Sequence, residues 1–181
     1  TIDGTLGAYF PIAIVNGYTF DGDGYTITYA GSSTWSGLLE VVSGSSGDTF
    51  TVQNTTFKLS SGGMTGACSC FFDSTGNNMG GADIIVTNCH STTDDAYSSS
   101  NTDGMYISGG SGGIVGKNCA YNGDVLIQYC SNTIPIYGDR AGGLVGVVAC
   151  TNGGSMIIKY SYNTGAILSN ECGGLIGHNT A

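Results

Sequence analysis

Charged residues are scarce in this 181-residue chain, at 9% of the total, and proline occurs only twice. An average soluble domain has roughly 25% charged residues. Long amphipathic helices need a charged face and coiled coils need charged flanking positions, so the sequence predicts neither. No apolar run approaches the roughly 18 residues of a membrane-spanning helix. Hydrophobic residues nevertheless make up 40% of the chain, which argues against disorder because they can build a core.

Cations are the scarcest charged residues. The four are Lys58, Lys117, Arg140 and Lys159, against thirteen Asp and Glu residues, and the formal net charge is −9. Nucleic-acid binding by phosphate neutralisation requires clustered Lys or Arg, so we expect no nucleic-acid partner. We interpret the acidity as a solubility feature.

What the chain has in abundance is glycine, serine, threonine and asparagine, which supply nearly half of its residues. A pentapeptide of the form GG-apolar-apolar-G begins at Gly112, Gly142 and Gly173, which are 30 and 31 residues apart, and a weaker copy begins at Gly62. A second element recurs between these copies: DIIVTNC from 83, DVLIQYC from 124 and SMIIKYS from 155. The runs are short, rich in β-branched residues and bounded by turn-forming residues, which is typical of strands.

Repeats of about 30 residues that hold short strands and no helix predict an all-β fold, a right-handed parallel β-helix. We expect about 30 residues per coil and five to six coils in a single domain over 1–181. Residues 1–35 form an N-terminal capping coil in this interpretation, and 36–181 form repeat coils with a polar loop inserted at about 90–111. Glycine and asparagine would make the corners between strands. Stacked like charges would repel each other, so outward positions favour uncharged polar residues.

Seven cysteines suggest an oxidising compartment. The sequence contains no C-x-x-C pair, which argues against a zinc site. Cys89 and Cys130 occupy the same place in the second element. Cys70, Cys119 and Cys150 follow their GG pairs by seven or eight residues. Equivalent positions on stacked coils lie within disulfide distance. This predicts a Cys89–Cys130 bridge and a bridge from Cys119 to Cys150 or Cys70, and the alternative is a column of buried thiols.

The last unit, YSYNTGAILSNECGGLIG at 160–177, resembles the GLUG repeat, whose units read C-Y-N-T-G-x-I followed by G-G-L-V-G. The resemblance covers about 62–177. The segment PIAIVNGYTFDGDGYTITYAGSS at 11–33 is similar to the first coil of many right-handed parallel β-helix proteins. These resemblances imply an extracellular, repetitive, structural or adhesive protein on a cell or virion surface, and they carry no catalytic residue.

One tetrapeptide points to an enzyme. Asn101-Thr-Asp103-Gly resembles the N-T-D-G motif of polygalacturonases, in which the Asp is one of three catalytic carboxylates. The family pattern also includes a paired Asp-Asp about one coil later and a basic Arg-x-Lys. In this chain the paired acids Asp94 and Asp95 precede the motif, and no Arg-x-Lys occurs. A polysaccharide-binding or polysaccharide-degrading β-helix, with the loop at 90–111 over its groove, is therefore the alternative function.

Two further patterns are weaker. Asp21-Gly-Asp23-Gly could form half of a calcium loop, although a tight turn is the simpler explanation of this pattern. The loop that contains Asp94, Asp95 and Asp103 is a second calcium candidate. We expect no other cofactor or metal. Asn54-Thr-Thr is an N-glycosylation sequon.

The leading functional interpretation is an extracellular structural or adhesive building block. GGLIG starts a new coil just before the final residues, so we expect an uncapped edge there that can pair with further strands. The partner would be a second copy, stacked head to tail into a fibre, or neighbouring repeats of a longer chain, and glycans are a further possible partner. A viral or phage fibre segment is another alternative.

Overall fold

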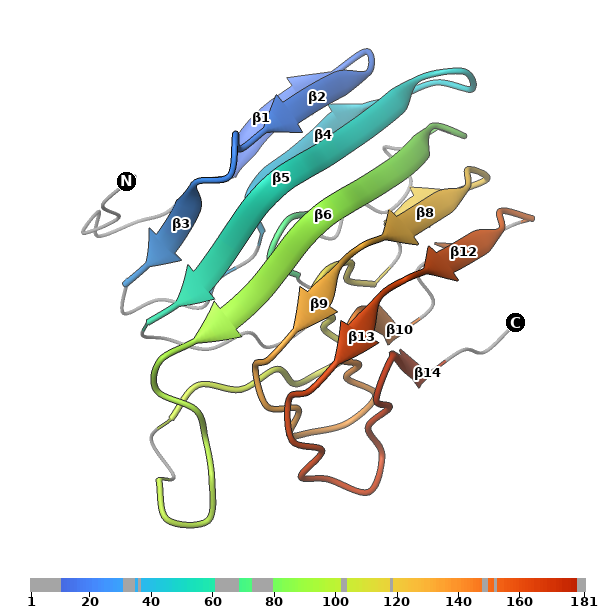
Figure 1. Ribbon diagram of the computed structural model, residues 1–181. Coiled ribbons are helices and arrows are strands. Elements are labelled where there is room, and N and C mark those ends of the chain that lie inside the picture. Colours follow the sequence, from blue (N-terminus) through green and yellow to red (C-terminus); the bar gives the residue numbers. More distant parts are fainter. Residues whose placement is uncertain are drawn as a thin grey trace.

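The computed structural model describes residues 11–30, 35, 37–60, 69–72, 80–101, 104–117, 119–147, 150–151 and 153–178. Within these ranges the chain contains strands and turns but no helix, as predicted (Figure 1). The strands are β1 (Ile12–Val15), β2 (Tyr18–Asp21), β3 (Thr26–Tyr29), β4 (Leu39–Ser43), β5 (Thr49–Leu59), β6 (Asp83–Thr93), β7 (Ala120–Tyr121), β8 (Val125–Gln128), β9 (Ser131–Asn132), β10 (Val145–Val147), β11 (Cys150–Thr151), β12 (Met156–Lys159), β13 (Tyr162–Asn163) and β14 (Ile176–His178).

The main sheet is entirely parallel and holds one rung from each turn of the chain. The long strands β5 and β6 pair with each other, β2 and β3 pair with the two halves of β5, and β8 and β9 pair with the two halves of β6. The last rung consists of β12 on β8 and β13 on β9. This arrangement confirms the predicted parallel β-solenoid.

The turns differ in length. Paired residues on successive rungs are 32, 34, 41 and 31 positions apart in the sequence. The chain therefore completes about four turns. The prediction of five to six coils was too high, because every turn is longer than the 30 residues that the pentapeptide spacing indicated and the third step is much longer.

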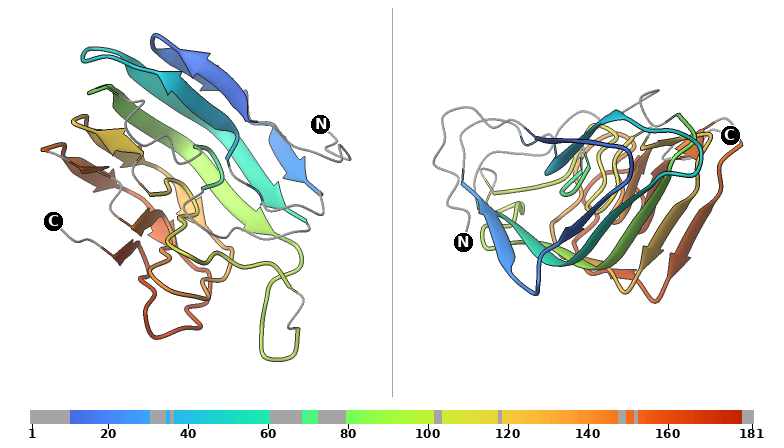
Figure 2. Two further views of the ribbon diagram at one scale, coloured as in Figure 1. Left: turned by 180° about the vertical axis from the view of Figure 1, so that it is seen from behind. Right: turned by 90° about the horizontal axis from the view of Figure 1, so that it is seen from above.

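The remaining named strands lie around the interior opposite the main sheet, and they are parallel as well. β1 pairs with β4, β7 with β11 and β10 with β14. Single bridges join Gly112 to Gly142 and Gly142 to Gly173, so the first glycines of the repeated pentapeptides stack in one column. Figure 2 shows the chain winding around this common interior.

Apolar columns fill the interior. One column runs through Leu39, Phe72, Val115 and Val145, which are all inaccessible to solvent. Aromatic side chains fill the first turns: the Trp35 ring lies 4.8 Å from that of Tyr29 and 4.5 Å from that of Phe57. A buried indole N–H needs an acceptor. The Trp35 Nε1–H donates to the backbone oxygen of Ser69 at 3.1 Å.

The rung formed by β2 and β3 turns through two residues with positive φ, Asp23 (49°) and Gly24 (77°), and each of the other four rungs of the main sheet bends at one. The bend residues of these four rungs are Asn54 (52°), Asn88 (51°), Tyr129 (55°) and Tyr160 (50°), which occupy one column on four turns. Asparagine adopts this conformation more readily than other non-glycine residues. The Asn88 amide donates to the Asn54 side-chain oxygen at 3.0 Å, and the Tyr129 and Tyr160 rings stack at 5.1 Å.

An extra loop explains the longest turn. Strand β6 continues to Thr93, so the first four residues of the segment 90–111 belong to the main sheet. Bridges between Ala96 and Met105 and between Ser98 and Asn101 then form a small projection. The chain rejoins the solenoid at Ile107, which bridges to Ile136 on the next turn.

Candidate functional site

Two carboxylates of the loop that suggested an enzyme or a calcium site, Asp94 and Asp95, are engaged in protein contacts. Asp94 forms an ion pair with Lys58 of the preceding turn. Asp95 Oδ1 accepts a hydrogen bond from the Asn101 amide at 2.6 Å. Asp103 lies outside the described residues. Among the residues that the structure describes, no group of three acidic, histidine or cysteine side chains could hold a metal ion.

Asp21 acts as a hydrogen-bond acceptor at the start of the bend column. Its carboxylate accepts from the Gln53 amide at 2.6 Å, from the backbone N–H of Asp23 at 2.9 Å and from the Asn54 amide at 3.2 Å. These donors, the Gln53 amide first, lower the pKa of Asp21 and keep it ionised at neutral pH. The groups around Asp21 are thus donors, which suit a carboxylate and not a cation.

The sequon residue Asn54 lies in the middle of β5. Its amide nitrogen donates to Asp21, and its amide oxygen accepts from Asn88. Both polar atoms of the side chain therefore link successive turns. A glycan on this nitrogen would replace one of its two amide hydrogens, next to the bond to Asp21.

Cys89 and Cys130 lie opposite each other on neighbouring turns, where the sequence placed them. The register aligns Thr87 with Gln128 and His90 with Ser131 on either side of them. Both are buried free thiols in this structure, so the predicted disulfide is not formed here. Hydrogen bonding to the Cys130 sulphur and burial raise the pKa of the Cys89 thiol.

The second predicted bridge rests on a register that the structure corrects. Cys150 pairs with Ala120, not with Cys119. The sequence argument treated seven and eight residues after GG as the same position. A difference of one residue moves a side chain to the other face of a strand, so Cys119 and Cys150 do not share a column. Cys70 and Cys119 are both buried.

A polar column inside the core was not predicted from the sequence. The Ser91 hydroxyl donates to Asn132 Oδ1 at 2.7 Å, and Asn132 Nδ2 donates to Asn163 Oδ1 at 2.8 Å. Ser91 and Asn132 are completely buried. The second glycines of the pentapeptides face this column, because a Cβ atom at Gly113 would lie 2.8 Å from Asn132 Oδ1. The recurrence of asparagine in SNT and YNT, 31 residues apart, is the signal that could have revealed it.

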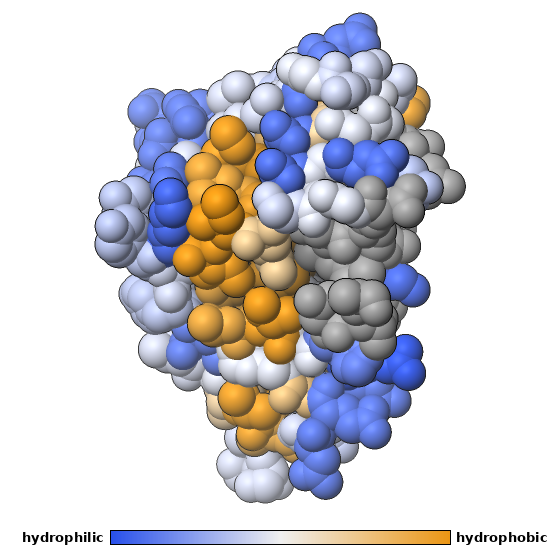
Figure 3. Space-filling model, turned by 90° about the vertical axis from the view of Figure 1, so that its right-hand side faces the viewer, coloured by the Kyte–Doolittle hydropathy of each residue, from blue (hydrophilic) through white to orange (hydrophobic). Residues whose placement is uncertain are grey.

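The last described turn carries core residues that are partly exposed. Register partners Val145 and Ile136 are inaccessible in the preceding turn, whereas Ile176 is 38% and Ile167 is 51% exposed. Met156 and Ile158 of β12 are half-buried, although their partners on β8 are almost completely buried. Figure 3 shows the resulting apolar band on the side of the molecule that lies to the right in Figure 1.

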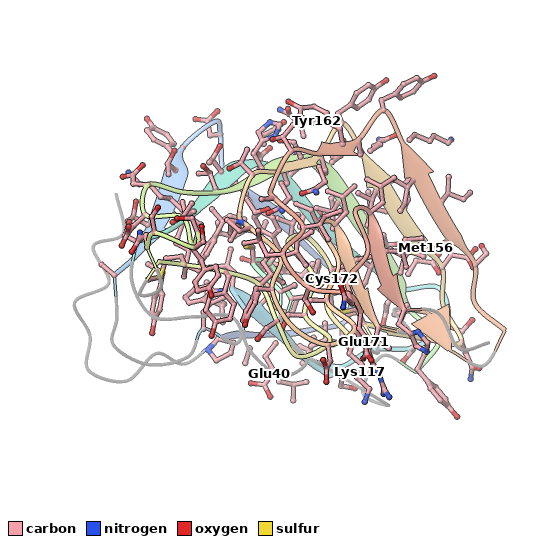
Figure 4. The ribbon with its side chains drawn as sticks, turned by 90° about the horizontal axis from the view of Figure 1, so that it is seen from below. Glu40, Lys117, Met156, Tyr162, Glu171 and Cys172 are labelled. Atoms are coloured by element: carbon pink, nitrogen blue, oxygen red, sulfur yellow. The ribbon has the colours of Figure 1, made fainter. Side chains whose placement is uncertain are left out.

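Polar groups border this end of the molecule. A hollow of about 470 Å³ is lined by Arg140, Asn170, Glu171, Cys172, Gly177 and His178. Cys172 is a half-buried free thiol that donates to the Gly138 carbonyl oxygen at 2.9 Å. Met156, Tyr162 and Cys172, which are labelled in Figure 4, all belong to the last turn.

Three tyrosines converge beside the projecting loop. The rings of Tyr97 and Tyr137 stack at 4.8 Å, and Tyr106 meets them edge-on at 5.2 and 5.5 Å. Desolvation and the neighbouring Tyr137 phenol raise the pKa of Tyr97. We call these three residues the tyrosine cluster.

Comparisons with protein-family models, with curated proteins and with solved structures found no match to this chain. No helix among the described residues is long and apolar enough to cross a membrane.

Proposed function

We propose that this chain is a non-enzymatic structural or adhesive unit of an extracellular fibre or surface protein, and that it associates end to end. The observation that carries the proposal is the half-covered core of the last turn. Ile176 and Ile167 expose 38% and 51% of their surface at positions that are inaccessible one turn earlier. Covering such side chains stabilises a contact by roughly 1 kcal/mol each.

The strand edges support the same proposal. Among the described strands, β12 is the last in the main sheet and pairs only with β8, while β2 lies at the opposite edge. The backbone groups on the outer sides of these strands can extend the sheet. An end-to-end contact between unlike edges does not close on itself and produces a filament.

Electron microscopy and sedimentation of the purified chain over a wide range of concentrations test this proposal. We expect filaments whose width is that of one solenoid and whose length increases with concentration. A protein that sediments as a monomer at every concentration would contradict end-to-end association.

An extracellular location carries a second expectation. Cys89 and Cys130 lie opposite each other, so thiol–disulfide exchange with an oxidoreductase would join neighbouring turns. Alkylation of protein that is isolated from its native source and unfolded in urea, before and after reduction, measures this. Labelling of both cysteines only after reduction supports an oxidising compartment, and labelling of both in unfolded, unreduced protein contradicts it.

Polysaccharide binding is a second candidate function, which the tyrosine cluster favours. Tyrosine rings can stack on the apolar faces of sugars while the hydroxyl groups remain solvated. Titration with acidic and neutral polysaccharides should show about three- to tenfold weaker binding for Tyr137→Ala. Tyr129→Ala removes an exposed ring outside the cluster and serves as the control. Cleavage that is lost in Asp103→Asn would contradict the non-enzymatic proposal.

A further inference from the structure

We propose that the partner of the last turn is a second copy of this chain, whose first turn continues the main sheet so that β2 lies along β12 and Asp21 lies opposite Lys159. The inference rests on the proposed end-to-end association and names the occupant and register of that contact. It is argued from the columns of the main sheet, the direction of its strands and the charges at its two ends.

The core columns of the sheet end in the same way at both ends of the molecule. Two of them cross every rung: Tyr18, Phe50, Ile84, Val125 and Met156 form the first, and Phe20, Val52, Val86, Ile127 and Ile158 form the second. The three middle members of each column are at most 1% exposed, whereas the members from β2 and β12 are exposed or half-buried. Stacking β2 on β12 would continue both columns without interruption and cover both ends.

Strand direction selects a head-to-tail contact. All pairs in the main sheet are parallel. The outer edge of β12 is therefore equivalent to the edge of β8 with which β12 itself pairs. The edge of β2 is the opposite one, since β2 pairs with β5 on its other side. A parallel contact between these unlike edges repeats the hydrogen-bond pattern already present in the sheet. A two-fold contact between two last turns would require an antiparallel pair, which the main sheet does not contain.

Charge complementarity fixes the register. The outward column next to the bend contains Asp21, Gln53, Thr87, Gln128 and Lys159. Only its two ends are charged, and their signs are opposite. Stacking β2 on β12 in register brings these exposed ends together, and an opposite-charge pair that lies directly across a ladder is favourable. The donors that hold Asp21 come from its own bend and from the second turn, so they leave the outer side of the carboxylate to a partner.

Carbodiimide cross-linking of assembled wild-type protein tests the register directly, because it joins a lysine to a contacting carboxylate. Within one chain Asp21 and Lys159 are separated by four steps of the ladder, or about 19 Å, so a bond between them must join two copies. We expect a Lys159–Asp21 cross-link in filaments assembled from a mixture of isotopically labelled and unlabelled protein. Part of the cross-linked peptide pairs should then join a labelled peptide to an unlabelled one, which shows that the bond connects two copies.

Charge reversal provides the second arm. Lys159→Glu should raise the concentration needed for assembly about tenfold, because it places like charges opposite each other. The double variant Asp21→Lys with Lys159→Glu should restore assembly. Lys117→Glu changes an exposed cation outside this column and serves as the matched control. If wild-type protein is monomeric throughout, the proposed function fails. If filaments form without the cross-link, and Lys159→Glu assembles as well as wild type, the proposed function stands but the proposed register is wrong.

Discussion

The polar column in the core offers the sharpest test of how the repeat is stabilised, through the substitution Asn132→Ala. Asn132 is completely buried, and its side chain makes four hydrogen bonds. Its Oδ1 accepts from the Ser91 hydroxyl at 2.7 Å and from the Ile134 N–H at 3.2 Å. Its Nδ2 donates to the Ile134 oxygen and to Asn163 Oδ1, both at 2.8 Å. Alanine removes all four bonds and leaves the polar groups of Ser91 and Ile134 inside the core.

The expected loss follows from the groups left without partners. A buried polar group without a hydrogen bond costs about 1–3 kcal/mol. The N–H and C=O of the inaccessible residue Ile134 are two such groups, so we expect the free energy of unfolding to fall by about 3–5 kcal/mol. The equivalent residue of the last turn, Asn163, bonds to the N–H and C=O of Gly165 at 3.1 and 3.0 Å, but it is only half-buried. Water can replace those bonds, so Asn163→Ala should cost about 1 kcal/mol.

Urea unfolding followed by far-ultraviolet circular dichroism, under reducing conditions, measures both variants. Asn132→Leu separates the hydrogen bonds from the cavity, because leucine restores the volume without restoring the bonds. It should be destabilised nearly as much as Asn132→Ala. The reasoning is refuted if Asn132→Leu is as stable as wild type, or if the two alanine variants lose the same free energy.

Three further predictions concern the stacking contacts, the acid side of the stability profile and the thiols. Gly143→Ala should destabilise the fold strongly, because the new methyl group would overlap the Gly174 carbonyl oxygen. Gly174→Ala is the control, since its methyl group would meet no atom closer than 3.4 Å. The urea midpoint of Gly143→Ala should therefore be the lower of the two, and equal midpoints would contradict this reasoning. Hydrogen bonds lower the pKa of Asp21 in the folded chain, so its ionised form stabilises the fold above the unfolded value of about 4 and this contribution is lost as the pH falls. The difference in urea midpoint between wild type and Asp21→Asn should shrink from about pH 6 to about pH 2, and a constant difference would exclude the mechanism. In reduced, folded protein, iodoacetamide should alkylate half-buried Cys172 and spare buried Cys89 until urea unfolds the chain, as peptide mass spectrometry would show; equal rates would be inconsistent with the structure.

Repetition made the architecture predictable. The glycine pentapeptides mark equivalent points on successive turns, and their first glycines form one column through Gly112, Gly142 and Gly173. Asparagine was expected at corners, and Asn54 and Asn88 do occupy the positive-φ bend of the main sheet. These features follow from local conformational preferences, which are readable in a single sequence.

The parts that sequence reasoning missed depend on contacts between turns. Tyr129 continues the bend column of Asn88 with a φ of 55°, although tyrosine has no preference for that conformation. Its ring stacks on that of Tyr160, so a contact to the next turn accompanies the unfavourable backbone. Asparagine was expected at corners in general, yet the side chain of Asn132 satisfies buried backbone groups inside the core. The prediction that Cys119 and Cys150 share a column was wrong, because a repeat spacing of about 30 residues does not fix the strand register to a single residue.

The scarcity of charge now has a more specific cause than repulsion between stacked side chains. Asp83 and Asp124 begin neighbouring rungs, and the register stacks these two acids directly. Asp83 Oδ1 accepts the Asp124 backbone N–H at 2.8 Å, and Asp124 Oδ1 accepts both the N–H and the hydroxyl of Ser155, also at 2.8 Å. Bonds from Ser155 lower the pKa of Asp124, so a carboxylate above another carboxylate remains ionised. Like charges can therefore stack where each one meets backbone donors of the next turn, which occurs at the beginning of a rung. Within a rung the ladder already uses the backbone N–H groups, so a carboxylate there depends on side-chain donors, as Asp21 does on Gln53 and Asn54. The three middle positions of its outward column hold uncharged Gln53, Thr87 and Gln128.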